Sequence, residues 1–353
     1  MIKSCYIHIP FCNNICFYCD FCKVYYNKSL VDEYLLALEK EIDLYYKNDS
    51  LSTLYIGGGT PSVLSTKQLE KLFLIINKLK LKDDIEFTFE CNINDINEEL
   101  LLFLRNNKVN RLSIGVESFN DKVLKVLGRS NNNTLDKINL CKKYFNNINI
   151  DLIYGVNNES LKDLKNDLDK FIRLNLNHIS IYSLILENNT ILKVNDYKEA
   201  SDDIVRDMYD LICNTLKDNN YIHYEISNFS KKGYESKHNL TYWNNNKYYG
   251  FGCGASGYID NIRYTNTRSI TNYIKGKYHF EEEILNERID MENYMILGLR
   301  EIKGINNIDF YNRYKKNISD VFDTSKLCKD GDRYFIKESD LFISNYILSD
   351  FIK

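Results

Sequence analysis

The sequence predicts an α/β protein whose main body is a partial, open (β/α)6 barrel of the TIM type, followed by a smaller α+β domain similar to a winged helix. Short apolar runs alternate with amphipathic segments through the first half of the chain, which indicates βαβ units and a parallel sheet. Six such units end near residue 184, too few for a closed eight-stranded barrel. Beyond residue 190 the alternation stops, and a helix-rich segment precedes short strands.

The elements of the first half follow one another in a regular order. Strands are expected at 5–9, 53–57, 86–90, 111–115, 148–154 and 178–184. Helices are expected between them at 30–44, 66–79, 98–106, 121–127 with 135–144, and 161–174. Ser65 and Ser160 stand where helix N-caps are expected. Because active sites of parallel barrels lie after the carboxyl ends of the strands, functional residues are expected there.

The second half is expected to differ from the barrel. We predict a barrel at 1–190, an extension packed on it at 191–285 and a small C-terminal domain at 286–353. The extension is predicted to contain a helix at 202–217, a strand at 221–228 and a segment rich in glycine and aromatic residues at 239–258. Helices at 291–299 and 308–314, then strands at 334–336 and 341–343, give the last domain its winged-helix-like order.

The composition indicates a globular chain without the basic patch that nucleic-acid binding requires. Hydrophobic residues make up 44% and charged residues 27%, and the net charge is −3. No run reaches the roughly 18 apolar residues of a membrane span. The N-terminus leads directly into the first predicted strand, so we expect a cytoplasmic protein. Its ten cysteines are then thiols or metal ligands rather than disulfides.

A group of cysteines directly follows the first predicted strand. Cys12, Cys16 and Cys19 have the spacing Cys-x3-Cys-x2-Cys, and thiolate is the preferred ligand of iron–sulfur clusters. A structural zinc site is the alternative, for which Cys5 or Cys22 could supply a further ligand. Such a site needs four ligands, usually as two separated pairs, so the spacing favours a cluster. Three cysteines would leave one iron open to another ligand.

Further motifs place the chain close to a known family. They are YIHIPFCNNICFYC (6–19), GGGTP (57–61), NRLSIGV (110–116), LGR (127–129), DLIYG (151–155), YEISNF (224–229), HNLTYW (238–243) and GCGA (252–255). Pro10 and Pro61, the only prolines, fall in the first two. Together these motifs resemble the radical S-adenosylmethionine superfamily, in the branch that contains oxygen-independent coproporphyrinogen III oxidase and the HemW heme chaperone. The resemblance implies that S-adenosylmethionine binds the open iron of a [4Fe–4S] cluster, where one-electron reduction cleaves it to a 5′-deoxyadenosyl radical.

The resemblance also implies which residues contact S-adenosylmethionine. They are Tyr6, Tyr18, Gly58, Gly59, Thr60, Glu90, Glu117, Arg129 and Asp151. Glycines at the end of a strand let the backbone approach a ligand closely. Glu117 stands where the family usually has glutamine; it still accepts a hydrogen bond from a ribose hydroxyl, but it adds a charge and cannot donate. Arg129 is expected to pair either with the methionine carboxylate or with Glu117.

Three features favour the chaperone branch over the oxidase. The cysteine motif starts close to the N-terminus, Asp20 and Phe21 follow Cys19, and the segment at 238–243 matches the chaperones. Cys22 is displaced by one position from the fourth cysteine of the oxidase pattern, so we expect a spare thiol there. The expected function is therefore heme binding and delivery, with oxygen-independent coproporphyrinogen III oxidase as the alternative.

The chaperone interpretation adds heme as a third cofactor. His238 is a candidate axial ligand, because histidine commonly ligates heme iron. Two departures from the family pattern are Ser256, in place of a histidine after GCGA, and Asn157 with Asn158, in place of Pro-Gly. The first removes a candidate second heme ligand, and the second is expected to alter only a loop.

Expected partners are heme or another porphyrin and heme-acceptor proteins, including membrane-associated ones. The chain is expected to be a monomer or a heme-linked dimer.

Overall fold

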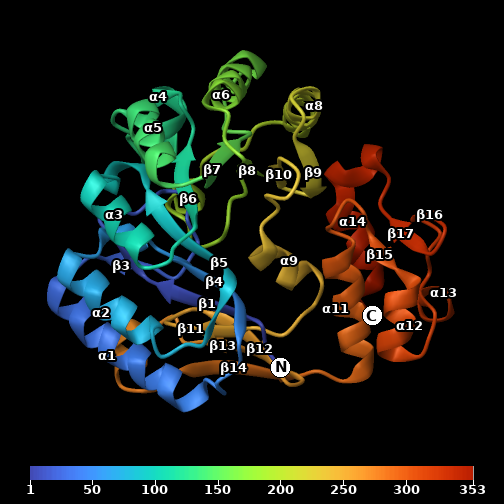
Figure 1. The fold of residues 1–353 in the computed structure, drawn as a ribbon. Helices are drawn as coiled ribbons and strands as arrows, with labels where there is room; N and C mark the ends of the chain where they lie inside the picture. Colours follow the sequence, from blue (N-terminus) through green and yellow to red (C-terminus); the bar gives the residue numbers. More distant parts are fainter. Residues whose placement is uncertain (353) are drawn as a thin grey trace.

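The centre of the fold is a nine-stranded sheet that curves into an open barrel (Figure 1). The structure is a computed structural model that describes residues 1–352. Six neighbouring parallel strands form the body of the sheet: β1 (Ser4–Ile9), β4 (Leu51–Gly58), β5 (Leu81–Asn92), β6 (Arg111–Glu117), β7 (Asn147–Tyr154) and β8 (His178–Ser183). Each one covers a predicted strand, and their parallel order confirms the predicted fold class.

Amphipathic helices lie on the outer side of this sheet (Figure 1). They are α1 (Lys28–Tyr45), α2 (Thr66–Ile76), α3 (Glu98–Asn106), α4 (Asp121–Val126), α5 (Thr134–Tyr144) and α6 (Leu161–Leu174). Ser65 and Ser160 form capping boxes at the starts of α2 and α6, as predicted. In α6, Leu164, Leu168 and Phe171 are buried at helical spacing, so one face of the helix packs against the core.

Later segments extend the sheet at both edges. The short strand β11 (Tyr249–Phe251) pairs in parallel with β1, and β10 (Asn228–Ser230) pairs antiparallel with β8 and with β9 (Ile222–Glu225). The single strand expected at 221–228 is therefore wrong, because this segment folds into a hairpin. Glu225 closes the turn by accepting hydrogen bonds from Ser227 N and the Asn228 amide.

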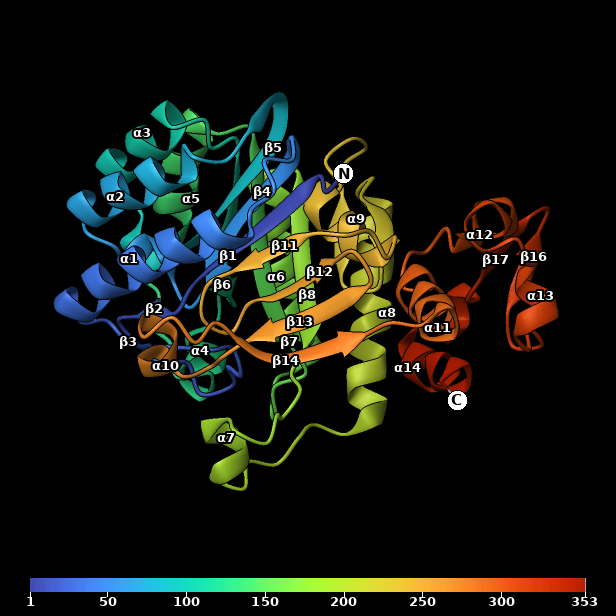
Figure 2. The ribbon, with the colours of Figure 1, turned by 90° about the horizontal axis from the view of Figure 1, so that it is seen from below.

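The remaining part of the middle segment surrounds the barrel. It contains α7 (Ile191–Val194), α8 (Asp202–Asp218), α9 (Lys237–Trp243), α10 (Ile270–Ile274) and an antiparallel sheet of β12 (Ser256–Ile259), β13 (Ile262–Asn266) and β14 (His279–Ile284). Figure 2 shows this sheet next to β11.

The C-terminal region combines helices with a second small antiparallel sheet. Its elements are α11 (Glu287–Gly298), β15 (Ile305–Asn306), α12 (Asn307–Tyr314), α13 (Ile318–Val321), β16 (Cys328–Asp330), β17 (Arg333–Phe335) and α14 (Ser344–Leu348). The strand expected at 341–343 is wrong: Glu338–Ile343 is a 3₁₀ helix, in which Leu341 packs inward while Ile343 remains exposed. The domain boundaries at 190 and 285 stay predictions.

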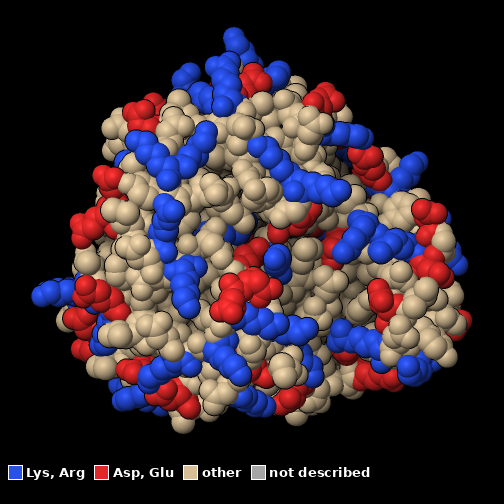
Figure 3. Space-filling view, in the orientation of Figure 1, with Lys and Arg blue, Asp and Glu red and all other residues tan. Residues whose placement is uncertain are grey.

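The surface carries charges of both signs. Lysines and arginines alternate with acidic residues over the face shown in Figure 3, in line with a net charge of −3. Within residues 1–352, no helix combines the length and the apolar character that crossing a bilayer requires.

Candidate functional site

The three motif cysteines lie on a loop that follows β1. The loop starts and ends at a short parallel ladder between β2 (Phe11–Cys12) and β3 (Val24–Tyr25). Val24 N donates a hydrogen bond to Pro10 O at 2.7 Å, next to this ladder. Because both ends are fixed by backbone hydrogen bonds, the cysteines between them are held next to the carboxyl ends of the barrel strands.

A second set of contacts holds the cysteine loop against the turn after α4. Phe17 N donates to Leu127 O at 3.0 Å, and Asn14 Nδ2 donates to Gly128 O at 2.7 Å. Gly128 has a φ of +72°, and a Cβ built there would lie 2.5 Å from the Phe17 ring. Only glycine fits this close approach, which gives the LGR motif a structural role in seating the loop.

Replacement of Gly128 by alanine is expected to lower the free energy of unfolding by about 2–4 kcal/mol. Part of the loss, about 1–2 kcal/mol, comes from the left-handed φ, and the rest comes from the clash with Phe17. Gly233→Ala is the matched control, because Gly233 has a φ of +86° and no atom within 4 Å of the added Cβ. Urea unfolding should therefore show a smaller loss for the control. Equal losses would contradict the packing role of Gly128.

The thiols of Cys12, Cys16 and Cys19 open into one cavity of about 140 Å³. Burial raises the pKa of all three thiols. The pKa of Cys12 rises to about 11, although Thr60 Oγ1 donates a hydrogen bond to its Sγ at 3.5 Å and so favours the thiolate. Metal ligation requires the thiolate form, and a bound metal centre would supply the positive charge that stabilises it.

The three motif cysteines line one cavity, and Cys22 is not among the residues that line it. The Sγ of Cys22 lies 3.7 Å from Cys253 Sγ and 3.5 Å from Arg268 O. Three thiols in one cavity, with Cys22 outside it, supply the three-cysteine donor set of a [4Fe–4S] cluster that has one iron left open.

The glycine-rich end of β4 brings the backbone against the cysteine loop and against Glu90. A Cβ built on Gly59 would lie 2.8 Å from Cys12 Sγ, so a larger residue would displace the thiol. Gly58 N donates to Glu90 Oε2 at 3.0 Å, and Tyr55 OH donates to Oε1 at 2.7 Å. Burial raises the pKa of Glu90 to about 7, while the hydrogen bond from Tyr55 opposes this rise.

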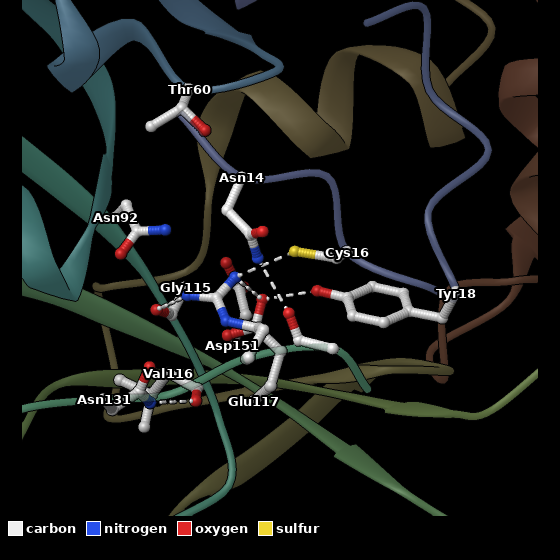
Figure 4. Close-up of polar contacts among 12 residues, drawn as sticks. Asn14, Cys16, Tyr18, Thr60, Asn92, Gly115, Val116, Glu117, Asn131 and Asp151 are labelled. Carbon is white, nitrogen blue, oxygen red and sulfur yellow. Dashed lines mark hydrogen bonds and ion pairs between the residues drawn. The ribbon is translucent and has the colours of Figure 1, made fainter. Parts of the chain in front are cut away.

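Glu117 and Arg129 form a buried ion pair beside the cysteines (Figure 4). Arg129 Nη1 and Tyr18 OH both donate to Glu117 Oε1, at 2.9 and 2.7 Å. Arg129 also donates through Nη2 to Gly115 O at 2.9 Å, and its Nη1 lies 3.7 Å from Cys16 Sγ. Of the two partners expected for Arg129, the structure contains Glu117.

Two carboxylates in the same cavity could accept hydrogen bonds from a ligand. Glu117 Oε2 is buried and has no hydrogen-bond partner, a situation that is rare in folded proteins. Asp151 is oriented by Asn149 Nδ2 at 2.8 Å and by Ser113 Oγ at 3.4 Å. Burial raises the pKa of both carboxyl groups. Hydroxyl or amino donors of S-adenosylmethionine would satisfy them, so these residues fit the cofactor that the motifs imply.

A larger cavity, of about 300 Å³, continues from the first one into the barrel. The two share the walls formed by Tyr18, Phe21, Glu90, Ser113, Glu117 and Asp151. Arg111, Asn149 and Ser180, from three neighbouring strands, line only the larger cavity. The barrel therefore has room for a second ligand beside the candidate cofactor pocket.

Most of the predicted cofactor residues line these cavities, but Tyr6 does not. The side chains or backbone of Tyr18, Gly58, Gly59, Thr60, Glu90, Glu117, Arg129 and Asp151 surround the smaller cavity. Tyr6 instead contacts His8 Nδ1 through its hydroxyl, at 2.9 Å, and packs against Tyr55.

His238 lies in the protein interior and is only 1% exposed. Its Nδ1 is 2.9 Å from Thr53 Oγ1 and its Nε2 is 2.7 Å from Tyr242 OH, so both ring nitrogens have protein partners. Burial lowers its pKa to about 3, which keeps the ring neutral. Heme ligation by His238 would therefore require one of these hydrogen bonds to break. Ser256 is the exposed first residue of β12, and its Oγ lies 3.1 Å from Thr265 Oγ1.

The sequence interpretation missed two residues of the site, His8 and Arg111. His8 Nε2 is 2.7 Å from Cys22 O, and its ring lies 2.9 Å from the position of a Cβ on Gly58. Arg111 lines the larger cavity. Arg111 shares a strand face with Ser113, two residues further along β6, because alternate residues of a strand point the same way, and Ser113 also lines this cavity.

Comparison with known proteins agrees with this site. Residues 6–171 match the Radical SAM superfamily. The heme chaperone HemW of Lactococcus lactis is 39% identical, over 99% of this chain and 97% of its own length. The heme chaperone HemW of Bacillus subtilis is also 39% identical, over 91% of this chain and 89% of its own.

The chain belongs to the HemW heme chaperone family.

Membership of the HemW family confirms the branch that the motifs predicted. Escherichia coli HemW is 35% identical, over 78% of this chain and 76% of its own length. Among solved structures, the coproporphyrinogen III oxidase HemN of Escherichia coli aligns with a TM-score of 0.87, over 99% of this chain and 90% of its own, at 21% identity. At that identity the likeness to HemN shows a shared fold, whereas the HemW relatives share the sequence as well.

Proposed function

We propose that this chain is a heme chaperone that binds heme and delivers it to acceptor proteins. The observation that carries the proposal is the 39% identity to a heme chaperone, HemW of Lactococcus lactis, along nearly the whole of both chains. The oxidase alternative rests on a likeness of fold at 21% identity, which does not favour it.

The proposed cofactors are a [4Fe–4S] cluster and S-adenosylmethionine. Cys12, Cys16 and Cys19 would hold the cluster, because their thiols share one cavity. The residues proposed to contact S-adenosylmethionine are Tyr18, Gly58, Gly59, Thr60, Glu90, Glu117, Arg129 and Asp151, which surround the same cavity. When bound, such a cluster supplies one-electron reduction of S-adenosylmethionine.

The protein residues have distinct proposed roles around these groups. Glu90 would accept a hydrogen bond from the methionine ammonium, since its carboxylate is already oriented by Tyr55 OH and Gly58 N. Arg129 positions Glu117 through their ion pair, which leaves Glu117 Oε2 available to a ribose hydroxyl. These contacts would bind and orient the cofactor.

The test is anaerobic reconstitution followed by two assays on the same preparation. The chain should bind heme, seen as a shift of the heme absorption spectrum, and it should pass that heme to an apo-acceptor protein. It should leave coproporphyrinogen III unchanged in the presence of S-adenosylmethionine and a reductant. Conversion to protoporphyrinogen would overturn the chaperone proposal in favour of the oxidase, and absence of heme binding would also overturn it.

A further inference from the structure

Arg111 is a buried cation without a partner of opposite charge. Its side chain starts at the amino end of β6 and is only 2% exposed. Its Nε has no hydrogen-bond partner, and within residues 1–352 Arg111 forms no ion pair. Arg129, which follows α4 and has a side chain only 8% exposed, is by contrast paired with Glu117. Buried charges in folded proteins are almost always paired, so an unpaired guanidinium inside a barrel needs an explanation.

Two acids interact with Arg111 without forming an ion pair with it. Its positive charge opposes part of the rise in the pKa values of Glu90 and Asp151. Each of them has its own hydrogen-bond donors, Tyr55 for Glu90 and Asn149 for Asp151. Glu90 and Asp151 also line the candidate cofactor pocket, whereas Arg111 lines only the larger cavity.

The larger cavity is polar inside and apolar at its rim. Asn149 and Ser180 line the cavity from β7 and β8, the next two strands of the sheet after the strand of Arg111. Phe21, Tyr182 and Ile185 line the same cavity, yet they are 68%, 42% and 59% exposed. Large apolar side chains at the edge of a pocket that contains one buried cation suit a ligand with an apolar body and an anionic group.

We propose that Arg111 binds a carboxylate of a porphyrin, whose apolar face rests on Phe21, Tyr182 and Ile185. A guanidinium presents two parallel N–H donors that match the two oxygens of a carboxylate. A cavity of about 300 Å³ admits a carboxyalkyl edge, and the macrocycle remains at the rim beside the cysteine loop. This inference rests on the proposed function, because it assigns a place to one part of the heme.

The experiment uses metal-free protoporphyrin IX and its dimethyl ester as probes, with the anaerobically reconstituted chain. Without iron there is no axial ligation, so the two probes differ only in their carboxylates. The wild-type chain should bind the diacid about tenfold to a hundredfold more tightly than the ester, as measured by fluorescence titration. Arg111→Met should bind both probes with the affinity that the wild type shows for the ester, and Arg111→Lys should retain part of the preference.

Arg105→Gln is the matched control, because Arg105 is an exposed cation in the last turn of α3. It should leave the preference for the diacid unchanged. Equal binding of diacid and ester by the wild type would overturn the Arg111 site even if Arg111→Met fails to fold, and so would an undiminished preference in folded Arg111→Met. In both cases heme binding by the wild type would leave the chaperone proposal intact. Absence of binding to heme and to both probes would overturn the two together.

Discussion

Replacement of Cys16 by alanine is expected to reduce the iron content of the reconstituted chain from about four atoms to nearly zero. Cys16 supplies one of the three motif thiols that open into the smaller cavity, together with Cys12 and Cys19. With only two thiolates left, two irons of the cluster would lack protein ligands. Iron and sulfide analysis, with the visible absorption of the cluster, measures the loss.

Cys22→Ala is the control for this variant. Cys22 is only three residues beyond Cys19, but its Sγ points to Cys253 and Arg268 O rather than into the cavity. The control should retain about four irons per chain. Equal loss of iron in both variants would show that Cys22 is a ligand, and one zinc per chain in the wild type would exclude the cluster.

Replacement of Arg129 by methionine is expected to destabilise the fold by about 3–5 kcal/mol and to abolish measurable binding of S-adenosylmethionine. The side chains of Arg129 and Glu117 are each only 8% exposed, so the change leaves a buried carboxylate without its counter-charge. It also removes the donor to Gly115 O and thereby frees the end of β6. Urea unfolding measures the first effect, and equilibrium dialysis against labelled S-adenosylmethionine measures the second.

A second substitution separates these two effects. Adding Glu117→Gln to Arg129→Met removes the unpaired charge, so most of the stability should return while cofactor binding stays weak. Arg173→Met is the matched control, since Arg173 is an exposed arginine at the end of α6. A double variant as unstable as Arg129→Met would contradict the charge-pair explanation. Wild-type cofactor affinity in Arg129→Met would show that the ion pair does not orient the pocket.

The sequence was sufficient where the information is local. Alternation of apolar residues with amphipathic stretches located the six parallel strands from β1 to β8 that form the body of the sheet, and Ser65 and Ser160 marked the starts of α2 and α6. The two errors, the hairpin at 222–230 and the 3₁₀ helix Glu338–Ile343, fall on short segments. A short segment has too few residues for a clear alternation of apolar and polar positions. Side-chain contacts, such as the hydrogen bonds that Glu225 accepts in the hairpin turn, then decide its conformation.

By itself, the sequence determined the barrel class, the cysteine motif and the family. Strand period, helix caps and ligand spacing depend on residues close together in the chain. Only the tertiary structure decided that Arg129 pairs with Glu117, that His238 is enclosed by Thr53 and Tyr242, and that Arg111 lies unpaired in the barrel. Each of these depends on packing between strands and helices that are distant in sequence. The hydrogen-bond and charge partners of a buried polar group are the side chains that this packing brings next to it.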